Sequence, residues 1–174
     1  AYLNPSYKFY CIEPSFENFK ILKKNFDSNL IKNNIKIYNA AISNKSGSET
    51  FIEGNSSTTG FLKSSNIFFD NNLQKEFVIK SFSFQDFLKK NNIDDIDILK
   101  VDIEGGEYLA FENNLDLLLR AKLIIFELHM CNNIIPEKTK LFKYINNNFK
   151  TSYYYPSKSY GNKLIEIFGK KKHD

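Results

Sequence analysis

Short apolar runs that end on an acidic residue are the sequence feature that most limits what this chain can fold into. Three such runs occur, at residues 8–12, 96–101 and 123–128, and the predicted strands close on Glu13, Asp102 and Glu127. Between them, apolar residues recur with the spacing of amphipathic helices. Strands that alternate with helices build a mostly parallel sheet covered on both faces, and ligands bind beyond the carboxyl ends of its strands. We therefore predict an α/β three-layer sandwich with its functional site at the strand ends.

The remaining elements are predicted from periodicity and from helix caps. Ser15 is a good N-cap for a helix, and Ser83 begins a Ser-Phe-Gln-Asp segment with the spacing of a capping box. We also predict strands at residues 35–42, 49–53 and 77–82, a polar surface segment at 54–72, a helix with Pro136 in its first turn, and an antiparallel pair at 152–155 and 164–168. A chain of 174 residues can form one domain with its own core, so residues 1–174 are expected to be a single domain.

Composition narrows the choice of partners. The net charge is +4, but nearly all of the positive charge is lysine, and Arg120 is the only arginine. Because arginine is the residue that reads bases and phosphates in a bidentate manner, we expect no nucleic-acid partner. No apolar run approaches the roughly 20 residues that cross a bilayer, and no secretory signal opens the chain. Cys11 and Cys131 are interpreted as free thiols, which fits a cytoplasmic location.

Glu13 stands where a strand turns sharply into a helix. A carboxylate at this place can accept hydrogen bonds from the vicinal hydroxyls of a ribose, as in dinucleotide-binding folds. It can equally be a solvated acid that helps the helix begin, because the amino-terminal end of a helix attracts negative charge. Spacing alone leaves both interpretations open.

The segment Asp102–Glu107 reads Asp-Ile-Glu-Gly-Gly-Glu and is more informative. Asp102 and Glu104 lie two residues apart at a strand end, and the glycine pair lets the backbone approach a ligand closely. Paired acids in this position can orient an acceptor group, take its proton or hold a divalent cation. The alternative is an acidic loop that is neutralised by Lys100.

Glu127 and His129 close the next strand. Strand alternation points both side chains to the same side, so the two can pair with each other. A histidine at such an edge can act as a general base near neutral pH. The alternative is a structural histidine. The second histidine, His173, lies in the tail and is expected to be inert.

Four segments occur in an order that resembles the FkbM family of S-adenosylmethionine-dependent methyltransferases. They are Ile12–Phe19 with its Glu-Pro pair, Asn39–Ser43 with Gly47 beyond it, Phe82–Phe87 followed by Ile96–Glu107, and Phe126–His129. The third contains Leu-Lys-Val-Asp-Ile-Glu-Gly-Gly-Glu, which is similar to the most distinctive motif of that family. Each segment is short, and the specificity lies in their order across residues 8 to about 130.

The resemblance implies a Rossmann-like methyltransferase fold and transfer of a methyl group from S-adenosyl-L-methionine to a hydroxyl oxygen of a sugar or related small molecule. It also implies roles for individual residues. Cofactor binding falls to Glu13 and Pro14 at the ribose, Ala40 and Ala41 beside the adenine, and Asp102 near the methionine part; the acceptor side comprises Asp102, Glu104, Glu127 and His129. No residue is assigned to a metal.

In one respect the chain departs from the family pattern. Family members carry an Asp-x-Gly-Ala-x-x-Gly block after their first strand, upstream of the Glu-Pro motif, and only seven residues precede the strand that begins at Lys8. We therefore expect a chain without the first strand and the glycine loop, with little cofactor affinity and no activity on its own. Two other functions stay open: a non-catalytic Rossmann-like binding module, and a nicotinamide-dependent Rossmann enzyme in which Glu13 binds that cofactor's ribose.

Overall fold

A computed structural model describes residues 6–28, 34–54, 60–65, 75–130, 134–155 and 164–172. Helices and strands are mixed along the chain, which confirms the α/β class. The helical elements are α1 (Phe16–Ser28), η1 (Lys63–Ser65), α2 (Phe84–Asn91), α3 (Glu107–Phe111), η2 (Leu115–Arg120), η3 (Pro136–Lys138) and α4 (Lys140–Asn148). The strands are β1 (Phe9–Ile12), β2 (Ile35–Tyr38), β3 (Ala41–Ser43), β4 (Gly47–Glu53), β5 (Gly60–Leu62), β6 (Lys75–Ser83), β7 (Ile96–Val101), β8 (Ala121–His129), β9 (Phe149–Tyr154) and β10 (Leu164–Lys171).

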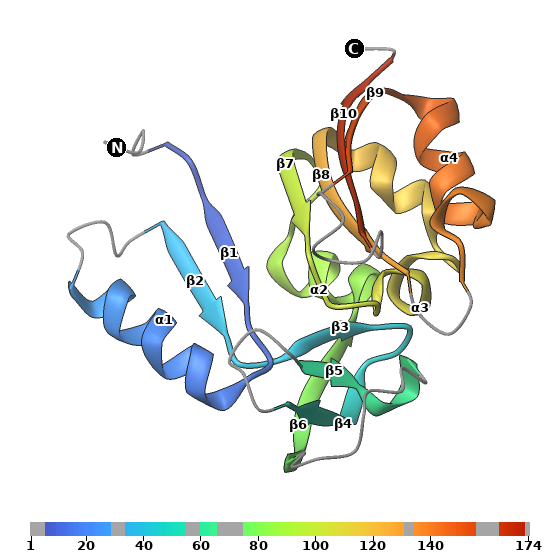
Figure 1. The fold of residues 1–174 in the computed structure, drawn as a ribbon. Coiled ribbons are helices and arrows are strands. Elements are labelled where there is room, and N and C mark those ends of the chain that lie inside the picture. The colour runs from blue at the N-terminus through green and yellow to red at the C-terminus, as the bar shows by residue number, and fades with distance from the viewer. Residues whose placement is uncertain are drawn as a thin grey trace.

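The described strands form three sheets (Figure 1). β1 and β2 make a parallel pair, and β7, β8, β10 and β9 follow one another in a four-stranded sheet. In that sheet β7 is parallel to β8, while β10 is antiparallel to both of its neighbours. The third sheet has the order β3-β6-β4-β5. The antiparallel pair predicted near the carboxyl terminus is therefore confirmed as β9 and β10.

The prediction of one mostly parallel sheet covered on both faces is not met by the described residues. Three strand pairs are parallel and four are antiparallel, and no ladder joins β1 to β7 within the part of the chain that is described. Two causes are visible. The segment between β3 and β6 folds into hairpin strands of its own, which adds two antiparallel pairs. The pair β1–β2 also stands apart from the β7-β8-β10-β9 sheet (Figure 1).

The main core lies on one face of the β7-β8-β10-β9 sheet. Side chains alternate along β8, so that Ile124, Phe126 and Leu128 are buried and pack with Phe111 of α3 and Leu141 of α4. The opposite face of this sheet shows large apolar side chains to solvent. The exposed fractions there are 59% for Ile98, 40% for Leu123 and 46% for Phe168. A second helical layer over this face, as in a three-layer sandwich, is absent from the described residues.

Several local predictions were confirmed, and others needed correction. Ser83 caps α2 by accepting a hydrogen bond from the backbone N–H of Asp86 at 3.1 Å. Pro136 begins the separate 3-10 turn η3, and α4 begins after it with Thr139 as its cap. The expected strand at 35–42 is interrupted at Asn39, whose side-chain amide donates to the carbonyls of Glu13 and Pro14. The polar segment 54–72 contains β5 and η1, and its residues 55–59 and 66–72 lie outside the described part. No described helix is long and apolar enough to cross a membrane.

Candidate active site

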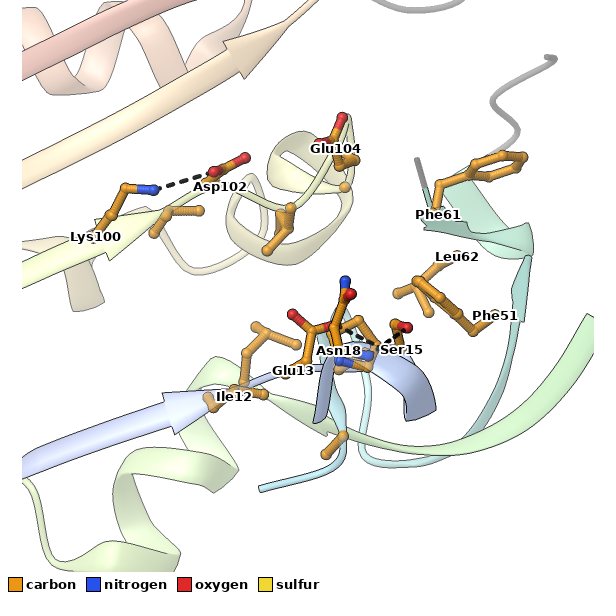
Figure 2. A pocket seen from close by; sticks show the side chains of 18 of the residues that line it. Ile12, Glu13, Ser15, Asn18, Phe51, Phe61, Leu62, Lys100, Asp102 and Glu104 are labelled. Carbon is orange, nitrogen blue, oxygen red and sulfur yellow. Dashed lines mark hydrogen bonds and ion pairs between the residues drawn. The ribbon is translucent and has the colours of Figure 1, made fainter. Parts of the chain in front are cut away.

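A cavity of ≈ 430 Å³ lies at the carboxyl ends of β1, β2 and β7. Figure 2 shows it between Glu13 on one side and the turn with Asp102 and Glu104 on the other, with the β4–β5 hairpin closing it. Residues at the carboxyl ends of these three strands line the same cavity, although within the described residues β7 belongs to a different sheet from β1 and β2. The cavity is therefore where the sequence predicted a ligand site.

Glu13 both lines the cavity and supports the start of α1. Its Oε1 accepts a hydrogen bond from the backbone N–H of Ser15 at 2.8 Å. The Ser15 hydroxyl accepts from the N–H of Asn18 and donates to Glu53 of β4. Burial raises the pKa of the Glu13 carboxyl, and the hydrogen bonds from Ser15 and Asn18 counteract only part of that rise. Both interpretations of Glu13 are therefore compatible with its position.

Apolar side chains form a further side of the cavity. Ala40 and Ala41 are buried and line the cavity, as do Phe51 of β4 and Phe61 and Leu62 of β5. The hairpin residues were not predicted as part of the site, because the signal of a three-residue strand inside a polar segment is too short to detect. Apolar side chains of this kind suit an apolar or aromatic part of a ligand.

Lys100 holds two of the predicted acids together. Its Nζ lies 3.1 Å from Asp102 Oδ2 and 3.4 Å from Glu127 Oε1. Burial disfavours the charge on Lys100, but the two carboxylates outweigh it and raise the lysine pKa. Asp102 lines the cavity. Glu127 lies beside it on β8, outside the residues that line the cavity, and burial followed by the charge of Asp102 raises its pKa.

His129 pairs with Glu107 and Glu104. Its Nδ1 lies 3.0 Å from Glu107 Oε1, and its Nε2 lies 3.4 Å from Glu104 Oε2. The expected pairing with Glu127 is wrong, because two side chains on the same side of one strand are about 6–7 Å apart along it. The first turn of α3 instead brings Glu107 against the ring. Sequence reasoning did not assign Glu107 to this cluster, although the Glu-Gly-Gly-Glu segment contains it.

This cluster is strongly acidic. Burial of the His129 ring opposes its positive charge, but the hydrogen bond and charge of Glu107, then the charges of Glu104 and Asp102, raise its pKa to about 9. Burial, followed by the charges of Asp102 and Glu107, raises the pKa of Glu104, which lines the cavity. Donor atoms of Asp102, Glu104 and His129 lie within 4.8 Å of one another, a spacing that a cation can bridge.

The structure thus brings Glu13, Pro14, Ala40, Ala41, Asp102 and Glu104 to one cavity. His129 lies outside the lining residues, with its Nε2 3.4 Å from Glu104 Oε2. Glu127 is joined to this group only through Lys100. Cys131 and His173 lie outside the described residues. The roles of all these residues in binding and catalysis stay predictions.

Comparison with known proteins gives one result that bears on identity. The family model for the methyltransferase FkbM domain matches residues 1–160. No curated protein and no solved structure matches the chain. The matched range includes all four motifs that suggested the resemblance, together with the cavity and the cluster around His129. The chain therefore belongs to the FkbM methyltransferase family.

Proposed function

We propose that this protein is an S-adenosylmethionine-dependent methyltransferase that methylates a hydroxyl group of a sugar or related small molecule. The observation that supports this most directly is the cavity at the strand ends, which has Glu13 and Asp102 on facing walls and the His129 cluster next to it. Family membership supports methyl transfer, and the donor and acceptor are the parts that we propose.

The residues of the cavity fit the proposed methyl donor. Its volume, ≈ 430 Å³, falls in the range of about 300–1,000 Å³ that small-molecule pockets occupy. Ala40, Ala41 and the hairpin side chains offer apolar surface to an adenine, and the Glu13 carboxylate offers acceptors to ribose hydroxyls. When bound, the cofactor supplies a methyl group on a positively charged sulfur. Asp102 and Glu104 give this end of the cavity the negative charge that favours such a cation.

The acceptor side is proposed to be the cluster around His129. A hydroxyl group becomes a better nucleophile as its proton leaves, so a base within hydrogen-bond reach is needed. His129 Nε2 faces Glu104 at the cavity wall and is the group that we propose for proton removal. Asp102 and Glu104 orient the hydroxyl, and Lys100 keeps Asp102 and Glu127 in place. Methyl transfer demands little else of the protein than this positioning.

A Rossmann-like arrangement of the strands is part of the proposal. Residues that follow β1, β2 and β7 all line the same cavity, which supports these strands being parallel members of one architecture. An experimental structure with S-adenosylhomocysteine tests the arrangement of these strands and the location of the bound cofactor. Ligand in this cavity supports the proposal, and ligand bound elsewhere contradicts it.

Isothermal titration is the direct test of the function. We expect the full natural protein to bind S-adenosylmethionine and S-adenosylhomocysteine, and Glu13→Gln to weaken both by about tenfold or more, since a lost charged hydrogen bond is worth about 1.5–3 kcal/mol. Glu17→Gln is the matched control, because Glu17 is an exposed acid on α1 that pairs with Lys20. A folded protein that binds neither S-adenosylmethionine nor S-adenosylhomocysteine refutes the proposed function. A heat of binding with a nicotinamide cofactor instead favours the dehydrogenase alternative. If none of these ligands gives a heat of binding, a non-catalytic binding module is favoured.

A further inference from the structure

Glu107 is the most deeply buried acid of the site. It is 0% exposed, and its Oε1 accepts hydrogen bonds from the backbone N–H groups of Ile103 at 3.3 Å and Gly105 at 3.1 Å. The same oxygen lies 3.0 Å from His129 Nδ1, while Oε2 has no hydrogen-bond partner among the described residues. A fully buried carboxylate is costly unless it is paired. Its charged partner is His129.

Glu107 also determines where Glu104 stands. The turn that carries Glu104 has left-handed backbone at Glu104 (φ 52°) and Gly105 (φ 89°), and its N–H groups point back to Glu107. One carboxylate oxygen therefore ties together the acidic turn and the imidazole. Tyr108, the next residue of α3, donates its hydroxyl to the His129 carbonyl at 2.9 Å and holds the other side of the same residue. The ring and the turn are fixed relative to each other.

We propose that Glu107 is the positioning residue of this site: it keeps a proton on Nδ1 of His129, so that Nε2 is the nitrogen that faces Glu104 and the acceptor. This inference rests on the proposed function and names its base. The acceptor's hydroxyl proton moves to the lone pair of Nε2. The imidazole becomes an imidazolium, and the oxygen keeps the electron pair with which it would take the methyl group. The bond between that methyl group and sulfur would break, and its electron pair would stay on the sulfur of the departing thioether, S-adenosylhomocysteine. The Glu107 carboxylate, 3.0 Å from Nδ1, stabilises the imidazolium.

The surrounding charges set the condition for this step, because His129 must be neutral before it can accept a proton. The charged groups that face the ring are Glu107 on α3 and Asp102 and Glu104 in the turn after β7, with Lys100 neutralising part of the charge of Asp102. All three acids favour the imidazolium. A cation that enters beside Asp102 and Glu104 disfavours the imidazolium form of His129 through charge repulsion. Binding of a sulfonium compound is therefore expected to release a proton from His129.

Nuclear magnetic resonance of the imidazole nitrogens tests the inference without an identified acceptor. The chain has two histidines, so His173→Gln assigns the His129 signals. We expect the neutral ring at high pH to carry its proton on Nδ1, and we expect S-adenosylmethionine to lower the titration midpoint of His129 more than the uncharged S-adenosylhomocysteine does. A neutral ring with its proton on Nε2 overturns the inference.

Two substitutions separate positioning from mere support of the fold. Glu107→Gln keeps an oxygen for the three N–H donors and removes the charge, so we expect the tautomer to stay and the midpoint to fall by about one pH unit or more. Glu107→Leu removes both the acceptor oxygen and the negative charge. If this variant folds, the neutral His129 ring should no longer prefer to carry its proton on Nδ1. Glu112→Gln, at the other end of the same helix, is the control and should change neither. An unchanged midpoint in Glu107→Gln contradicts the proposal.

The same spectra distinguish this inference from two other outcomes. Addition of Mn²⁺ that saturably broadens the His129 signals identifies the ring as a metal ligand and overturns its role as a base. A protein that binds neither sulfonium nor thioether compound, yet shows the Nδ1 tautomer and the shift in Glu107→Gln, refutes the methyltransferase proposal while the positioning of His129 by Glu107 stands.

Discussion

Replacing Gly60 by alanine should push the Phe51 ring out of its place in the cavity wall. A Cβ atom at Gly60 would lie 2.4 Å from Phe51 Cζ and 2.9 Å from Cε1, distances at which the ring has to move. Phe51 is buried against Ala41 and Leu62, so it has little room on the protein side. The cavity is the open direction, since Phe51 lines it.

The magnitude follows from two opposing contributions. Alanine in a strand is worth about 0.5–1 kcal/mol over glycine through backbone entropy, while a methyl group forced into a packed site costs about 1–3 kcal/mol. We expect Gly60→Ala to lower the free energy of unfolding by about 1–2 kcal/mol, and to weaken binding of S-adenosylhomocysteine because the ring enters the cavity. Urea denaturation and calorimetric titration measure the two effects.

A double-mutant cycle decides whether the contact with Phe51 is the cause. Phe51→Leu shortens the side chain, so Gly60→Ala should cost little in its presence, with a coupling of about 0.5–3 kcal/mol between the two changes. Gly47→Ala is the control: nothing lies within 4 Å of a Cβ there, and its cost comes from the backbone angle of φ 144°. That cost should be the same with either residue at position 51. Additive effects of Gly60→Ala and Phe51→Leu would refute the reasoning.

Two further predictions concern stability. The pKa of His129 is raised from its ordinary value of 6.5 to about 9 in the folded protein. The stabilising contribution of the charged ring is therefore complete below pH 6.5 and is lost as the pH rises toward 9. Urea denaturation should show a loss of at most a few kcal/mol in the free energy of unfolding over this pH range, and a smaller loss in His129→Gln. If stability instead rises over this pH range in the wild type and not in the variant, the assigned charge on His129 is wrong. Leu141→Ala, at a fully buried site in α4, should cost about 2–5 kcal/mol, whereas Val78→Ala, 78% exposed on β6, should change stability by less than about 0.5 kcal/mol. Equal effects at these two sites would contradict the placement of Leu141 in the core and of Val78 at the surface.

Local features of the fold could be predicted because they depend on neighbours within a few residues. The Ser83 cap, the alternation along β8 and the acids that follow β1 and β7 all arise from strand and helix periods that backbone geometry imposes. The antiparallel partnership of β9 and β10 is also a short-range feature, since the two strands are consecutive in the chain. Glu13 and Asp102 line one cavity, as the rule for parallel strands predicted, although within the described residues their strands β1 and β7 belong to different sheets.

The partners of the site residues were decided by tertiary structure. Glu107 meets His129 across 22 positions of sequence, and Ser15 meets Glu53 across 38. No periodicity indicates such contacts, because they depend on the angle at which α3 packs on β8 and on the path of the β4–β5 hairpin. The same holds for the division of the strands into three sheets, which the alternation of strands and helices did not predict. Sequence alone therefore determined that Glu13 and Asp102 follow strand ends, whereas Glu127, also predicted to close a strand, lies inside β8. Only packing over long distances decided which of the site residues touch.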